Sequence, residues 1–144
     1  MGYRVSTWEV DFHIPADKIA AALADISALQ RPCWNRNHAT GTAHNCQRLK
    51  PFDSLTEAVE ELTGFHDCEE SDVDGFNLGQ HLDKWMGTTD DVLHALGRHA
   101  TEGSYVRLVG EDYGLFGYRV VDGRTHIEDA TVTWTVSPTA MKAE

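Results

Sequence analysis

The residues best suited to chemistry lie in one polar stretch, from Arg31 to Lys50, which contains two of the three cysteines. Two thiols and two imidazoles occur there with the spacing C-x4-H-x5-H-x-C: Cys33, His38, His44 and Cys46. Four nitrogen and sulfur ligands satisfy tetrahedral zinc, and the metal would hold a long polar segment in order. The spacing differs from the usual paired ligands of zinc modules, so the alternative is His and Cys scattered along a loop.

A second group of candidates is acidic and lies between Phe65 and Gly75. A dense acidic surface docks on a basic partner and accelerates association, whereas the alternative is a solvated loop. Trp34 adds an aromatic side chain of the kind that carries interface energy. We therefore predict a partner-binding surface from these five residues: Trp34, Glu69, Glu70, Asp72 and Asp74.

Other chemistry is not indicated. The chain has no phosphate loop, nucleophile elbow, dinucleotide fingerprint or HExxH helix. Asp72 and Asp74 resemble the start of a calcium loop, but the twelfth position is Asp83 instead of Glu. We predict no catalytic residue, and no cofactor apart from the zinc considered above.

Charge and hydropathy narrow the class of protein. Lys and Arg number 12 and Asp and Glu number 23, which gives a net charge of −11. This balance argues against binding to the nucleic-acid backbone or to an anionic membrane. No apolar run approaches the roughly 20 residues of a membrane span, and no export signal opens the chain. We expect a cytoplasmic protein with free thiols, because a reducing compartment is the usual setting for such cysteines. The oligomeric state stays open.

Periodicity predicts the elements that must position these residues. Residues 3–14 alternate as a strand, with one face formed by Ser6, Trp8, Val10, Phe12 and Ile14. Helices are expected after Pro15 and after Ser54, where Ser54 and Glu57 have capping-box spacing. Residues 65–75 read as a solvated loop. Two further helices are expected, one with the apolar face Leu78, Leu82, Trp85 and Met86, the other with the face Val92, Ala95, Leu96 and His99.

The C-terminal stretch 104–136 predicts three strands joined by tight turns. Asp122-Gly123 is the strongest hairpin signal, since a type I′ turn requires a positive φ at both central residues. The last strand is expected to run to Val136, with one face formed by Ala130, Val132, Trp134 and Val136. The fold class is therefore α+β: one domain over 1–137 with about four mainly antiparallel strands, helices on one face, a long loop over 31–50 and a flexible tail over 138–144.

Both ends of the chain carry a recognisable pattern. The opening MGYRVSTWEVDF and the closing GEDYGLFGYRVVDGRTHIEDATVTW resemble small uncharacterised proteins of actinobacteria and their bacteriophages. The resemblance implies an α+β fold, and it suggests a bacteriophage accessory gene of unknown activity. It covers the two ends only and supplies no catalytic residue.

Two functions follow as expectations. The first is a small, acidic, non-enzymatic protein that binds another protein, plausibly a bacteriophage accessory factor that modulates a host protein. The alternative is a zinc-binding module, structural or hydrolytic, built on the ligands of the polar stretch 31–50.

Overall fold

An antiparallel sheet of six strands forms the main layer of the molecule, with the strand order β11-β10-β9-β1-β8-β5. The computed structural model describes residues 3–29, 32–34, 43–45 and 51–141. The α+β prediction is confirmed, but the main sheet has six strands instead of about four. Its strands are β1 (Arg4–Asp11), β5 (Phe65–His66), β8 (Gln80–Lys84), β9 (Tyr105–Gly110), β10 (Leu115–Val121) and β11 (Arg124–Asp129).

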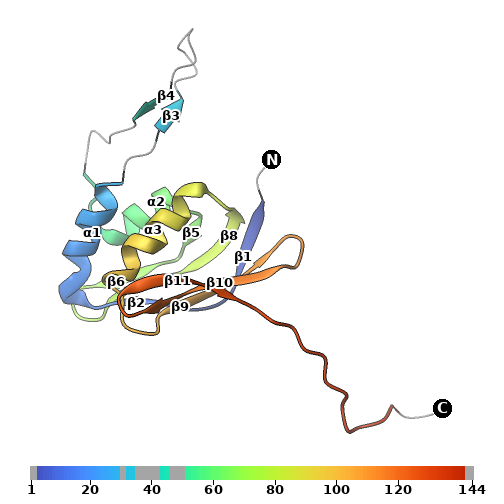
Figure 1. The fold of residues 1–144 in the computed structure, drawn as a ribbon. Coiled ribbons are helices and arrows are strands. Elements are labelled where there is room, and N and C mark those ends of the chain that lie inside the picture. Colours follow the sequence, from blue (N-terminus) through green and yellow to red (C-terminus); the bar gives the residue numbers. More distant parts are fainter. Residues whose placement is uncertain (1–2, 30–31, 35–42, 46–50, 142–144) are drawn as a thin grey trace.

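Three helices gather on one side of this sheet (Figure 1). They are α1 (Ile19–Ser27, which follows the 3-10 turn η1 at Ala16–Lys18), α2 (Leu55–Leu62) and α3 (Gly87–Gly97). The core lies between the two layers and is formed by fully buried side chains such as Val5, Val106 and Leu108 from the sheet and Ile26, Val59 and Leu96 from the helices. No helix in the described ranges is long and apolar enough to cross a membrane.

The start of α2 confirms the predicted helix start, with Ser54 as its N-cap. Ser54 Oγ accepts a hydrogen bond from the Glu57 main-chain N–H at 3.0 Å, and the Glu57 carboxylate accepts one from the Asp53 N–H. These bonds satisfy main-chain donors that have no partner within a helix. The helix predicted after Pro15 and the helix predicted from Val92, Ala95, Leu96 and His99 are likewise present as α1 and α3.

Two small sheets complete the described chain. β2 (His13–Ile14), β7 (Gly75–Asn77) and β6 (Glu69–Ser71) form a three-stranded sheet, while β3 (Pro32–Trp34) pairs with β4 (Ala43–Asn45). The polar stretch 31–50 therefore contains two short strands where we expected only a loop.

The segment 65–86 corrects two predictions. The expected loop over 65–75 contains β5, β6 and the start of β7, because Phe65 (1% exposed) and Phe76 belong to the core. The expected helix with Leu78 and Leu82 on one face is absent, and β8 occupies most of its place. In β8 the side chain of His81 is buried between the exposed neighbours Gln80 and Leu82, which is the period of a strand. Pairing with β1 and β5 outweighs the local helical spacing.

A β-bulge corrects the predicted faces of the first strand. Thr7 lies opposite Leu108, and Glu9 lies opposite Arg107, so Trp8 is the extra residue between them. Trp8 was expected on the core face with Val10 and Phe12. The bulge places it outside, where its side chain is 64% exposed.

The last strand ends at Asp129, seven residues before the predicted end at Val136. Its partner β10 begins at Leu115, directly after the turn from β9, so no strand of the described chain lies opposite residues 131–136. The chain continues away from the sheet in an extended course (Figure 1). The apolar side chains of this segment are exposed, with Trp134 at 92%.

Candidate functional site

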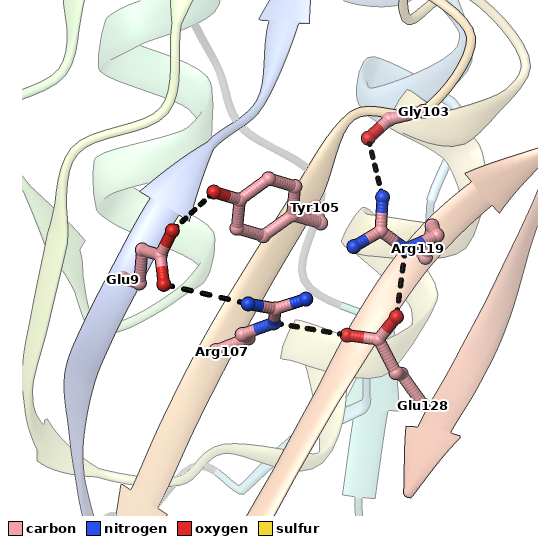
Figure 2. A network of polar contacts seen from close by, with 6 residues as sticks. All are labelled: Glu9, Gly103, Tyr105, Arg107, Arg119 and Glu128. Carbon is pink, nitrogen blue, oxygen red and sulfur yellow. Dashed lines mark hydrogen bonds and ion pairs between the residues drawn. The ribbon is translucent and has the colours of Figure 1, made fainter. Parts of the chain in front are cut away.

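The face of the sheet opposite the helices carries a network of polar side chains (Figure 2). Successive side chains of a strand point to opposite faces of the sheet. On β9, Val106 and Leu108 therefore lie in the core, while Tyr105 and Arg107 lie on the open face. The same alternation places Glu9, Arg119 and Glu128 on the open face, on the strands β1, β10 and β11. Figure 2 shows how these side chains converge.

Two carboxylates and two guanidinium groups alternate through this network. Glu9 accepts a hydrogen bond from Tyr105 Oη and lies 3.4 Å from Arg107 Nη1. Glu128 accepts from Arg119 Nε at 2.7 Å and from Arg107 Nε at 3.2 Å, while Arg119 Nη1 donates to the Gly103 carbonyl. Side chains of β1, β9, β10 and β11 are thereby tied together on one surface (Figure 2).

The network perturbs the titration of its members. The hydrogen bond from Arg119 lowers the pKa of Glu128, and Arg107 adds to the effect. The hydrogen bond to Glu9 raises the pKa of Tyr105, so the phenol stays protonated. Both guanidinium carbons, of Arg107 and of Arg119, lie 4.7 Å from the centre of the Tyr105 ring, within cation–π range. The charges of the network are balanced among themselves.

Gly117 on β10 leaves room for the side chain of Arg107 to extend across the strand. A Cβ at Gly117 would lie 2.7 Å from the Val106 carbonyl oxygen and 3.5 Å from Arg107 Cγ. Because this side chain is missing, Arg107 crosses β10 and meets Glu128 on the next strand.

A groove of about 470 Å³ lies beside the network on the same face. Trp8, Leu115 and Gly117 supply apolar lining, Arg107 supplies one positive charge, and the acidic lining residues are Glu9, Glu128 and Asp129. Arg107 and Arg119 balance Glu9 and Glu128 within the network, so Asp129 gives the groove its negative balance. The exposed Trp8 indole and the acidic lining together suit an extended segment with apolar and basic side chains.

The predicted acidic residues lie on the β6–β7 hairpin, and their roles differ. Glu69, Asp72 and Asp74 are exposed there. Glu70 instead accepts hydrogen bonds from the Thr56 main-chain N–H at 2.7 Å and from Thr56 Oγ1 at 2.8 Å. Glu70 thus stabilises the start of α2, where a carboxylate is favoured.

The predicted zinc ligands are described only in part. The main chain of Cys33 lies opposite that of His44 in the β3–β4 ladder, and Trp34 lies opposite Ala43. His38 and Cys46 lie outside the described residues. Within the described ranges, no group of three or more His, Cys, Asp or Glu side chains could hold a metal ion.

The third cysteine, Cys68, is partly buried. Cys68 Sγ accepts a hydrogen bond from the Gly79 N–H, and burial raises the pKa of this thiol to about 12. The thiolate, which is the nucleophile and metal ligand, is therefore scarce at neutral pH.

The sequence did not predict the network or the groove. The Asp122-Gly123 turn fixes Val121 opposite Arg124, and counting back places Gly117 opposite Glu128. This register was available from the sequence, but the bulge at Trp8 was not. Comparisons with protein-family models, with curated proteins and with solved structures found no match to this chain.

Proposed function

We propose that this protein acts by binding another protein through the open face of its sheet. The observation that carries the proposal is the groove beside Trp8, whose indole is 64% exposed at a bulge that holds it out of the core. Tryptophan next to a groove is a frequent centre of interface energy. The hydrogen-bonded network behind the groove holds its charged walls in place before a partner arrives, which lowers the entropy cost of binding.

The charge of the molecule suggests the chemistry of the partner. A net charge of −11 and a groove with more carboxylates than guanidinium groups favour a partner segment with basic and apolar side chains. The exposed acids Glu69, Asp72 and Asp74 lie outside the groove, and their contribution is long-range attraction that raises the association rate. The resemblance of both ends to actinobacterial and bacteriophage proteins extends the proposal. The partner is a host protein, and this chain is a bacteriophage accessory factor.

Affinity capture tests the proposal with matched variants. The tagged full-length chain is incubated with actinobacterial lysate, and retained proteins are identified by mass spectrometry. Trp8→Ala is expected to lose the retained protein, whereas Tyr113→Ala, which removes an even more exposed aromatic ring on the β9–β10 turn, is expected to keep it. Equal retention by both variants would reject the groove as the binding site.

The β3–β4 ladder favours a second candidate function, a zinc-binding module. Cys33 and His44 are paired residues of this ladder, and a thiolate and an imidazole are ligands that zinc uses. Metal analysis of protein purified without chelators tests this candidate. One zinc per chain that is lost in Cys33→Ser would support it, and metal-free folded protein would reject it.

A further inference from the structure

The outer edge of β11 is unpaired within the described chain, because β11 is the last strand of the sheet. The turn at Asp122-Gly123 makes Val121 and Arg124 the first pair of the hairpin. In a two-residue hairpin this pair is hydrogen-bonded, and the pattern then alternates. Thr125, Ile127 and Asp129 therefore direct their main-chain N–H and C=O groups away from β10, toward the edge.

The segment that follows β11 has the composition of a strand and pairs with nothing in the described chain. Residues 131–136 read TVTWTV, with β-branched and aromatic side chains at every position. They contain no charge, and Val132, Trp134 and Val136 are exposed. Soluble proteins usually protect such an edge with charge, proline or a covering element. An exposed segment of this composition next to an open edge indicates a missing strand partner.

We propose that two copies of this protein exchange these segments and form a dimer about Ala130. Each copy lays residues 131–136 antiparallel against β11 of the other copy, so that the six residues of the segment match the six residues of β11. In this register Ile127 faces the partner's Thr133, and Asp129 faces the partner's Thr131. Thr125 faces the partner's Thr135, so all three residues that point their main chain outward find a partner.

Hydrogen bonding and charge both support a second copy as the occupant. Each hydrogen-bonded pair contributes two main-chain hydrogen bonds, which gives about twelve across the two exchanged strands. Two copies with a net charge of −11 each repel one another over most of their surface. Along the exchanged strands, however, every charged residue of β11 faces an uncharged one: Arg124 faces the partner's Val136, and Glu128 faces the partner's Val132. No like charges lie directly opposite one another at this interface.

The dimer also has a consequence for the groove. Ala130 and Thr131 line its wall, and Ala130 lies on the two-fold axis of the proposed dimer. The two grooves of the dimer would therefore flank the axis closely, on one continuous sheet.

Sedimentation velocity of the full-length chain tests the exchange. The wild-type chain is expected to be dimeric, and Thr133→Pro, which lacks the N–H that donates to the partner's Ile127, is expected to weaken the dimer at least about tenfold. Ala140→Pro is the matched control outside the exchanged segment and is expected to remain dimeric. A full-length chain that is monomeric up to its solubility limit would overturn the proposal and leave the segment to a strand of a different protein. So would a dimer that Thr133→Pro does not weaken.

Cysteine cross-linking tests the register. Ala130 of one copy faces Ala130 of the other in a pair without hydrogen bonds, where Cα atoms are about 4.5 Å apart, within the range of a disulfide. Ala130→Cys is expected to form a covalent dimer on mild oxidation, and mass spectrometry is expected to show a peptide linked through position 130 on both copies. Val132→Cys should form no such link to its counterpart, because the partner's Glu128 lies opposite position 132. A link through position 132 with none through position 130 would overturn the proposed register.

Discussion

Arg107 on β9 reaches Glu128 on β11 across the strand between them, with 3.2 Å from Nε to Oε1. Gly117 is the residue of β10 that lies between Arg107 and Glu128. Glycine in the interior of a strand weakens it, so its presence here indicates that the crossing of Arg107 outweighs that cost. The pair joins three strands of the open face into one surface.

Gly117→Ala is predicted to destabilise the fold. The added Cβ would lie 2.7 Å from a main-chain carbonyl oxygen, so β9 and β10 must separate. We expect a loss of about 1–3 kcal/mol in the free energy of unfolding, measured by urea denaturation. Gly87→Ala is the control, because a Cβ there meets nothing within 4 Å. A Gly117→Ala protein as stable as the wild type would contradict the tight crossing.

Glu70→Ala is predicted to destabilise α2. The carboxylate of Glu70 satisfies the Thr56 N–H in the first turn of the helix, so its loss should cost about 0.5–2 kcal/mol, as loss of a cap does. Glu69→Ala removes an exposed neighbouring carboxylate and is expected to change stability by less than about 0.5 kcal/mol. Thermal unfolding of the two variants gives the comparison. Equal effects would contradict the structural role assigned to Glu70.

Acid is predicted to destabilise the protein through His81. Its side chain is 1% exposed, Nδ1 lies 2.6 Å from the Val5 carbonyl oxygen, and burial lowers the pKa of the ring. Below about pH 6.5 the unfolded chain binds a proton at this position that the folded chain does not. The free energy of unfolding therefore decreases as the pH is lowered. Histidine NMR titration should place the pKa of His81 below that value.

The pH dependence of His81→Phe provides the control for that prediction. The variant should lose less stability than the wild type between neutral pH and pH 5, measured by urea denaturation at each pH. If His81→Phe keeps the full slope, another group is responsible.

Cys68 is predicted to resist alkylation in the folded protein. Its pKa of about 12 leaves little thiolate at pH 8, and partial burial limits access of the reagent. Iodoacetamide followed by peptide mapping should show Cys68 unmodified in native protein and modified in guanidinium chloride. Rapid modification of the native thiol would contradict its raised pKa.

The sequence predicted the parts of the fold that local chemistry determines. The capping box at Ser54 and Glu57 marked the start of α2, and the Asp122-Gly123 turn marked the hairpin of β10 and β11. Local spacing failed where pairing decides the structure. Leu78 and Leu82 have helical spacing, yet β8 forms there because β1 and β5 both pair with it. The end of β11 depends on where β10 begins, which no pattern in residues 130–136 reveals.

The candidate site was less predictable than the fold. Arg107, Arg119 and Glu128 each read as an ordinary polar residue on the outer face of a strand, and only the register brings them together. Trp8 read as a core residue because a bulge is invisible to strict alternation. The acids at 69–74 were conspicuous in the sequence, but one of them, Glu70, is occupied by α2.

The most direct test of binding through the open face places a photoreactive benzoylphenylalanine at position 8. The full-length chain is irradiated in actinobacterial lysate, and covalent adducts are identified by mass spectrometry. Binding in the groove predicts one protein adduct from position 8 that is absent when the same group replaces Tyr113. No adduct from position 8, or the same adducts from both positions, would contradict binding at this face.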